Sequence, residues 1–154
     1  MTENNLAPSE EGEEAPQPLR DRILNHGFRH PLEHFTQFYL ERDDVEQATR
    51  MQQRWADSVQ RPELPAGIRA ISLYTLALFY ATTKQEIPAL ETLRQARAFN
   101  PDPGIQSIIL YTLAHSYATS QQPARAAKSL REALALNPAL AEYSRADPDL
   151  QHLL

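Results

Sequence analysis

Apolar residues recur three or four positions apart along most of the chain, which is the spacing of an amphipathic helix. In residues 31–44 this places Leu32, Phe35 and Tyr39 on one face. The pattern predicts further helices over 45–59, 68–83, 86–99, 105–120 and 123–136, with Asp44 as the N-cap of the second helix. Proline-containing loops separate them, and four glycines are too few for a strand-rich chain with tight turns. We therefore expect an all-α fold.

Two shorter elements are expected at the ends of this helical series. The stretch LRDRILNHGF, residues 19–28, predicts a short helix that stops at Gly27. Near the C-terminus, Asp147 followed by Pro148 is typical of a helix start, and it predicts a short final helix with Asp147 as its N-cap.

One sequence phrase occurs twice, as LYTLALFYAT from Leu73 and as LYTLAHSYAT from Leu110. Residues 73–101 align with 110–138 without a gap, and 16 of the 29 positions are identical. Each copy spans two predicted helices, so the repeat unit is a helical hairpin. A fixed period of this length is the signature of stacked-repeat proteins.

The shared positions resemble the tetratricopeptide repeat, or TPR, in its bacterial form. The pattern of bulky, Leu, small, Tyr, then Ala, large apolar, small and Pro occurs in both copies: Leu73, Leu76, Ala77, Tyr80, Ala89, Leu93, Ala96 and Pro101, then Leu110, Leu113, Ala114, Tyr117, Ala126, Leu130, Ala133 and Pro138. A weaker earlier copy contains Leu32, Phe35, Thr36, Tyr39 and Ala48, but it has Gln52 where an apolar residue is expected. The resemblance implies a right-handed stack of three hairpins at about 29–62, 70–103 and 107–140, closed by a capping helix over 141–154.

The resemblance also implies a concave groove lined by the first helix of each repeat. The residues expected to face it are Ile71, Tyr74 and Leu78 in one copy, Ile108, Tyr111 and His115 in the next, and Glu33 and Gln37 in the weak copy. Two interpretations remain open: these residues pack against neighbouring hairpins, or they form a Tyr-lined groove for a peptide or helix. Glu33, Gln37, Thr75, Ile108 and Thr112 occupy the positions at which some members of the family clamp a terminal carboxylate, and the absence of a cation there argues against that ligand.

The net charge of −5 comes from one end of the chain. Residues 1–16 contain five glutamates and no Lys or Arg, so the other 15 acidic residues balance all 15 basic ones. We expect residues 1–18 to be a disordered acidic tail preceding a repeat domain over 19–154. The neutral body favours neither nucleic acid nor a membrane as a partner. With no secretory signal expected at the start, we predict a cytoplasmic protein.

Motifs that carry chemistry are few. The chain has no cysteine, no glycine-rich phosphate loop and no G-x-S-x-G. His30, Glu33 and His34 spell the H-x-x-E-H signature of some zinc peptidases, but Pro31 favours a helix that starts after His30, which would separate the two imidazoles. The pairs Asp43–Asp44 and Asp147–Asp149 are interpreted as helix caps. The basic set Arg20, Arg22 and Arg29 is either a solvated face or a site for an acidic strip or phosphate.

These observations favour a non-enzymatic protein-interaction module, an adaptor, scaffold or assembly chaperone, with no cofactor and no metal. The alternative is a self-associating module whose groove is filled by its own tail or by a second copy, and only the second copy would make it a homodimer. A metal-dependent hydrolase that uses His30 and His34 is the remote third hypothesis. The sequence does not identify a protein partner.

Overall fold

The protein is represented by a computed structural model that describes residues 30–153. The described part is entirely α-helical apart from turns and one short 3₁₀ helix, which confirms the predicted all-α class. The acidic tail predicted for 1–18, the helix expected at 19–28 and the basic set of arginines lie outside the described residues. No helix within 30–153 combines the length and the apolar character needed to cross a membrane.

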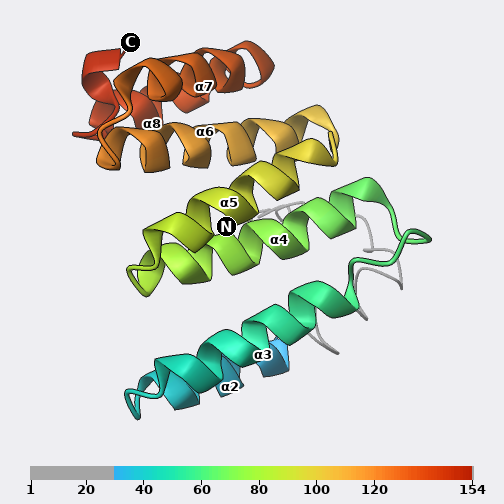
Figure 1. Cartoon of the computed structure of the whole chain (residues 1–154). Helices are drawn as coiled ribbons and strands as arrows, with labels where there is room; N and C mark the ends of the chain where they lie inside the picture. Colours follow the sequence, from blue (N-terminus) through green and yellow to red (C-terminus); the bar gives the residue numbers. More distant parts are fainter. Residues whose placement is uncertain (1–29, 154) are drawn as a thin grey trace, which may run out of the picture.

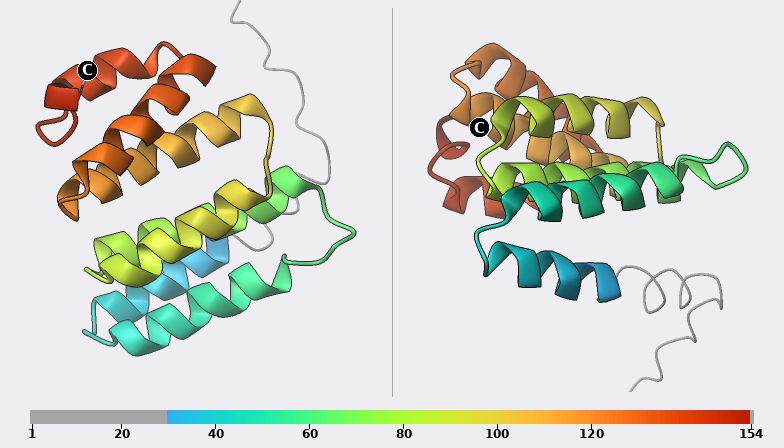
Figure 2. Two further views of the ribbon diagram at one scale, coloured as in Figure 1. Left: turned by 45° about the horizontal axis from the view of Figure 1, so that its top comes forward. Right: turned by 60° about the horizontal axis from the view of Figure 1, so that its bottom comes forward.

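Six of the described helices pair into three consecutive hairpins (Figure 1). They are α2 (His30–Leu40) with α3 (Val45–Ser58), α4 (Ala66–Thr82) with α5 (Glu86–Ala98), and α6 (Pro103–Thr119) with α7 (Pro123–Leu136). The helix α8 (Leu140–Ala146) and the 3₁₀ helix η2 (Gln151–Leu153) follow and pack against α7. Both views of Figure 2 show the hairpins following one another in chain order.

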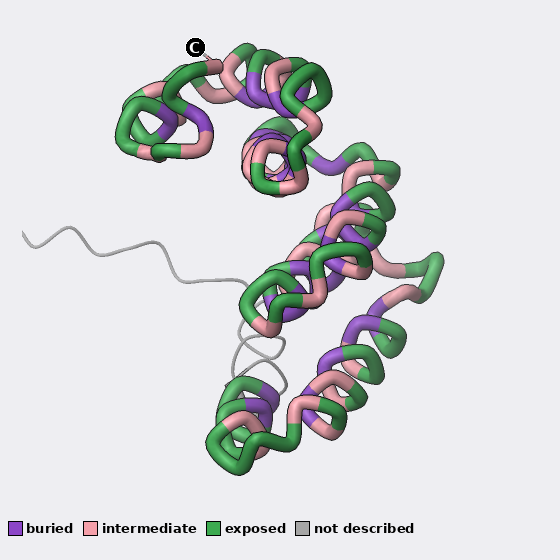
Figure 3. Tube along the Cα trace, turned by 60° about the vertical axis from the view of Figure 1, so that its left-hand side comes forward, coloured by how far each residue is buried: buried purple, intermediate pink, exposed green. Residues whose placement is uncertain are grey.

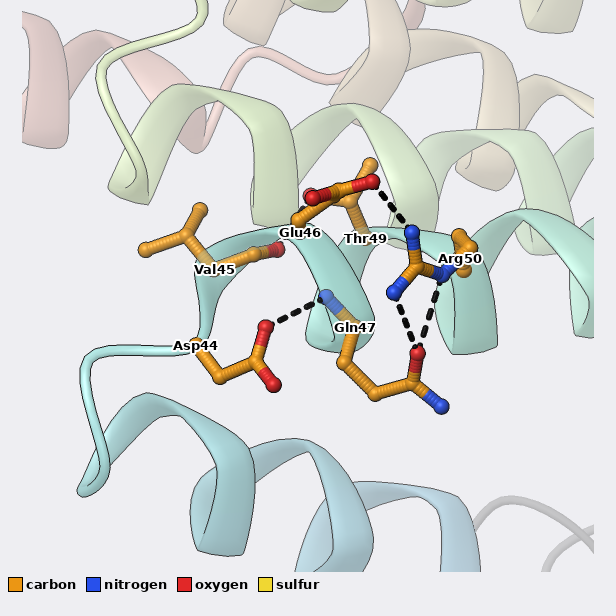
Figure 4. Close-up of polar contacts among 6 residues, drawn as sticks. All are labelled: Asp44, Val45, Glu46, Gln47, Thr49 and Arg50. Atoms are coloured by element: carbon orange, nitrogen blue, oxygen red, sulfur yellow. Dashed lines mark hydrogen bonds and ion pairs between the residues drawn. The ribbon is translucent and has the colours of Figure 1, made fainter.

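The helix starts follow from local capping. The carboxylate of Asp44 accepts a hydrogen bond of 3.0 Å from the backbone N–H of Gln47, as predicted, and Arg50 pairs with Glu46 one turn further along α3 (Figure 4). At α6, Asp102 accepts hydrogen bonds from the N–H groups of two following residues, and Pro103 takes the first helical position, where its missing N–H costs nothing. This capping starts α6 two residues earlier than the sequence predicts.

The same turn closes all three described hairpins. Asp43, Lys84 and Gln121 each adopt a left-handed backbone conformation, with φ of 60°, 60° and 56°. The following N–H then reaches back to the carbonyl of a tyrosine at 2.9, 2.8 and 2.8 Å: Asp44 to Tyr39, Gln85 to Tyr80, and Gln122 to Tyr117. This backbone bond from six residues back to one is the Schellman arrangement of helix ends. The first hairpin therefore has the turn geometry of the two copies that the sequence repeats.

The matched apolar positions form the core. In the second and third hairpins, Leu93 and Leu130 are each 1% exposed, and small residues on both helices, such as Ala77 and Ala89, allow the close approach (Figure 3). Burying a leucine side chain contributes about 1.5–3 kcal/mol. Both leucines are among the largest fully buried side chains of the described residues.

The core of the first hairpin differs from the other two at Gln52, the position where the sequence pattern calls for an apolar residue. Gln52 is 5% exposed, and its Nε2 donates a 2.9 Å hydrogen bond to Oγ1 of Thr36, which is 6% exposed. A buried polar pair thus stands where the later hairpins pack leucine against alanine. Phe35 is 55% exposed, whereas Leu76 and Leu113, at the matched positions, are 6% and 1% exposed.

Consecutive hairpins are joined by a repeated hydrogen bond. Nε2 of Gln53 donates to the hydroxyl of Tyr80 at 2.7 Å, and Nε of Arg94 donates to the hydroxyl of Tyr117 at 3.1 Å. In each case the donor lies on the second helix of the earlier hairpin and the tyrosine on the first helix of the next. The two interfaces among the described hairpins therefore share one contact between matched positions.

The C-terminal segment differs from the predicted capping helix over 141–154. The chain forms two short elements, α8 and η2, and Asp147 is the C-cap of α8, not the N-cap of a final helix. Its carboxylate accepts a hydrogen bond from the N–H of Asp149 at 2.9 Å, which tightens the turn between the two elements. Leu150 is fully buried against Ala114 and Leu130, so this turn anchors the segment on the third hairpin.

Candidate functional site

The surface that carries the predicted binding residues lies on α4 and α6. Ile71, Tyr74 and Leu78 are spaced three and four residues apart on α4, so they share one side of that helix; Ile108, Tyr111 and His115 repeat this spacing on α6. These six residues are called here the α4–α6 face. They lie on a different side from the core positions Leu73, Leu76 and Tyr80.

The aliphatic members of the α4–α6 face are open to solvent. Ile71 is 40% exposed, Leu78 38% and Ile108 45%, whereas Tyr74, Tyr111 and His115 are half-buried. The neighbouring helices therefore cover more than half of each of these three aliphatic side chains and leave the rest open to solvent. A cluster of exposed apolar side chains that includes aromatic rings is typical of an interaction surface.

Tyr74 connects the two helices. Its hydroxyl lies 3.4 Å from Oγ1 of Thr112, which is also 3.0 Å from the carbonyl oxygen of Ile108. A carbonyl can only accept, and threonine has a single hydroxyl proton. When Thr112 donates to that carbonyl, the Tyr74 hydroxyl must be the donor toward Thr112. The bond orients the Tyr74 ring between α4 and α6.

The C-terminal segment closes one end of the α4–α6 face. Nε2 of His115 lies 3.5 Å from a carboxylate oxygen of Asp149 and 3.9 Å from one of Asp147. Ser144 and Asp147 both act on the pKa of the Tyr111 hydroxyl, Ser144 lowering it and Asp147 raising it. The pKa of Tyr111 is raised above its usual value of 10.0, first because burial penalises the phenolate and then because the charge of Asp147 opposes it. The neutral phenol is thus the form that fits this corner.

His115, Asp147 and Asp149 are residue types that ligate divalent cations, and their ligand atoms lie within 4.8 Å of one another. One oxygen of Asp147 already accepts the N–H of Asp149, and the imidazole and both carboxylates hold the C-terminal turn against α6. Sequence patterns do not predict this cluster, because the aspartates lie 32 and 34 positions after His115 and approach it only through the path of α7 and α8.

The two predicted binding residues of the weak copy lie on α2, and the described hydrogen bond of the Gln37 side chain stays within that helix. Glu33 and Gln37 are exposed on α2, and Nε2 of Gln37 donates along its own helix to Glu41 at 3.1 Å. The helix α2 begins at His30, one residue earlier than predicted, so His30 starts the helix and is not a cap outside it. His34 is exposed on the same helix.

Three surface cavities are lined by residues within 30–153, and none of these three includes one of the predicted binding residues. Two cavities of about 500 Å³ each flank the junction of α5 and α6 and share Asn100 and Gln106. A third, of about 370 Å³, lies between α3, α4 and α5 and includes Gln60 and Phe99. None of these three cavities was predicted from the sequence. The cavity that includes Tyr117 and the one that includes Gln60 lie between consecutive hairpins, whereas the remaining one is lined by α6, α7 and the loop before α6.

No family model matches this chain, and no match was found among the curated proteins or the solved structures. The resemblance to the TPR therefore rests on the residues of the repeated copies.

Proposed function

We propose that this protein is a non-enzymatic interaction module of TPR-like architecture that binds a peptide or helical segment of a partner protein through the α4–α6 face. The observation that carries the proposal is the exposure of Ile71, Leu78 and Ile108 on two adjacent helices, beside two half-buried tyrosines. Apolar burial supplies most of the free energy of such docking, and tyrosine combines a flat apolar ring with a hydroxyl that can reach a backbone group.

The TPR-like part of the proposal is supported by recurrence. The three described hairpins share one left-handed turn, and the two interfaces between them share one tyrosine hydrogen bond. The small and apolar residues that carry the resemblance in the second and third hairpins are buried. In a TPR-like stack the α4–α6 face would belong to the concave side.

The test is a quantitative capture of partners from the native cell with three variants of the full chain. Tyr74→Ala should weaken capture of the principal partner by about 2 kcal/mol, or roughly 30-fold in affinity, if Tyr74 is a hot spot. Leu78→Ser should weaken it as well. The matched control is Ile87→Ser, which removes an aliphatic side chain that is 73% exposed on α5, outside the face. Recovery of the same partner at wild-type levels with both face variants would refute the proposal.

Self-association through the same face is the second candidate, and the same exposed aliphatic residues favour it. A light-scattering mass of 17.5 kDa at all concentrations would exclude a homodimer. A mass that doubles with concentration in the wild type but not in Leu78→Ser would establish one. The hydrolase hypothesis for His30 and His34 predicts bound zinc, which metal analysis of protein purified without a His tag would detect.

A further inference from the structure

We propose that His115, Asp147 and Asp149 bind a divalent cation, with Zn²⁺ as the best match, and that the ion fixes the C-terminal segment to α6. His115 lies on α6, Asp147 ends α8, and Asp149 lies in the turn between α8 and η2. The proposal does not depend on the proposed function, because the ion would join two parts of this chain and requires no partner protein.

The ligand types indicate which ion fits. The cluster supplies one imidazole nitrogen and two carboxylate oxygens, so it is not merely a group of acidic residues at the surface. Imidazole and carboxylate are both ligands of Zn²⁺, and three protein ligands leave the fourth position of a tetrahedral site to water. Ca²⁺ takes about six to eight oxygen ligands, and Mg²⁺ is bound mainly through oxygen as well, so an imidazole with only two carboxylates suits neither.

The distances between the ligand atoms are closer to those around a metal than to those of hydrogen bonds. Nε2 of His115 lies 3.5 Å from Oδ2 of Asp149 and 3.9 Å from Oδ2 of Asp147. A charge-assisted hydrogen bond is shorter, about 2.7–2.9 Å. Ligand atoms about 2.1 Å from a tetrahedral metal lie about 3.4 Å from one another. All three atoms are within 4.8 Å of one another, and a rotation of the half-exposed Asp149 side chain can close the remaining gap.

The charges around the cluster also favour a cation. Within residues 30–153, no Lys or Arg forms an ion pair with either aspartate, so two carboxylates face a single imidazole. Like charges this close repel each other, and a dication between them would neutralise both. Binding would therefore remove a repulsion inside the C-terminal turn as well as add bonds to α6.

The surroundings of the cluster orient one ligand and leave an entry path. Oδ1 of Asp147 accepts a 2.9 Å hydrogen bond from the N–H of Asp149, which holds the carboxylate with Oδ2 toward His115. Hydrogen bonds of this kind orient the ligands of metal sites. The side chains of His115 and Asp149 are 45% and 48% exposed, so an ion can enter from solvent.

The test is calorimetric titration of Zn²⁺ into the full chain, purified without a His tag and freed of metal with a chelator. We expect saturable binding of one ion per chain. His115→Gln and Asp149→Asn should each weaken the affinity at least tenfold, since even the loss of an outer-shell partner costs a metal site about 10–100-fold. The matched control is His34→Gln, which removes an exposed imidazole on α2 and should leave the affinity unchanged.

Thermal unfolding separates the loss of a ligand from a loss of folding. In excess chelator, Asp149→Asn should melt within about 2 °C of the wild type, because it is an isosteric change at an exposed side chain. Free Zn²⁺ at 100 times its dissociation constant should raise the melting temperature of the wild type by about 5 °C or more. The same concentration should raise that of Asp149→Asn by no more than about half as much.

Three results would overturn the proposal. The first is no saturable binding of Zn²⁺ by the wild type. The second is equal affinity in the wild type, His115→Gln and Asp149→Asn, which would mean an adventitious ion only. The third is binding that is lost in His34→Gln but kept in His115→Gln, which would assign the metal to the H-x-x-E-H motif. None of these readouts involves a partner, so a failed titration leaves the proposed interaction function standing, and a failed capture experiment leaves the metal site standing.

Discussion

The first hairpin buries the polar pair Thr36 and Gln52 where the other two bury alanine and leucine, and the effect of this difference on the free energy of unfolding can be measured. The perturbation is the double substitution Thr36→Ala/Gln52→Leu, which rebuilds the small-residue and leucine contact of Ala77 with Leu93. Each single substitution is made as well, so that the four proteins form a thermodynamic cycle. The two sites touch, so the cycle measures their coupling directly.

The magnitudes follow from which polar atoms are left unpaired. In the wild type the Oε1 atom of Gln52 is buried without a hydrogen-bond partner, whereas its Nε2 is bonded to Thr36. Thr36→Ala removes the only described partner of that amide and should cost about 1–3 kcal/mol. Gln52→Leu loses the same hydrogen bond as the double variant and removes the unpaired oxygen, and the threonine hydroxyl can turn to a carbonyl of its own helix, so this change should also stabilise the protein by about 1–2 kcal/mol.

The double variant loses one hydrogen bond, worth about 0.5–1.5 kcal/mol, but it also removes a buried unpaired oxygen that costs about 1–3 kcal/mol. We expect it to be more stable than the wild type by about 1–2 kcal/mol once the added burial of leucine is included. For a chain of this size, the melting temperature should rise by about 2–4 °C per kcal/mol.

Urea unfolding provides the assay, followed by far-ultraviolet circular dichroism and by the fluorescence of Trp55. This residue is the only tryptophan of the chain and lies in α3, the helix that carries Gln52. If the circular dichroism and fluorescence transitions coincide, unfolding can be treated as two-state and described by a single free energy. The reasoning is refuted if Thr36→Ala leaves stability unchanged, or if the double variant is less stable than the wild type.

Three further predictions concern single residues. Spectroscopic titration should find that Tyr111 ionises above pH 10, and Asp147→Asn should lower the pKa of Tyr111. Because the folded-state pKa is raised, the stability that the neutral phenol contributes is fully present below about pH 10 and is lost as the pH rises through the folded-state pKa. A Tyr111 that titrates at its ordinary pKa would contradict the described surroundings of its hydroxyl. Gln121→Gly should stabilise the protein by about 1 kcal/mol in thermal unfolding, since glycine adopts a φ of 56° without the steric cost of a side chain, and a lower melting temperature would speak against that cost. Asp44→Ala should destabilise the protein by about 1 kcal/mol through the loss of the α3 cap, and an unchanged urea midpoint would show that solvent replaces the cap.

Local signals account for the parts of the fold that could be predicted from sequence. Apolar spacing located all six helices of the hairpins, and its prediction for α7, residues 123–136, agrees with the structure at both ends. The Asp44 cap depends on contacts within three residues, so a short stretch of sequence suffices to predict it. The start of α6 was missed because Asp102 and Pro103 were interpreted as a break in the chain, although together they form a strong start signal.

The features that could not be predicted depend on contacts between distant residues. Asp147 has the local sequence of an N-cap, but the burial of Leu150 against α6 and α7 fixes the turn in which Asp147 instead ends α8. Likewise, nothing near His115 in the sequence indicates that two carboxylates will lie within 4 Å of its imidazole. The exposed side of α4 could be predicted only through the family resemblance, because α4 is apolar almost all round and periodicity does not separate its two faces.

The tyrosine bonds between hairpins have a consequence for the order in which the molecule opens. Each hairpin contacts mainly its immediate neighbours. The cooperativity of unfolding therefore depends on the interface between each pair of neighbouring hairpins, and it is weaker where that interface contributes less stability. The first hairpin buries an amide where the others bury leucine, while the last is sealed by Leu150. Native-state hydrogen exchange should therefore be graded along the chain, with the backbone amides of α2 and α3 exchanging through partial unzipping while α6 and α7 remain protected until the whole molecule unfolds.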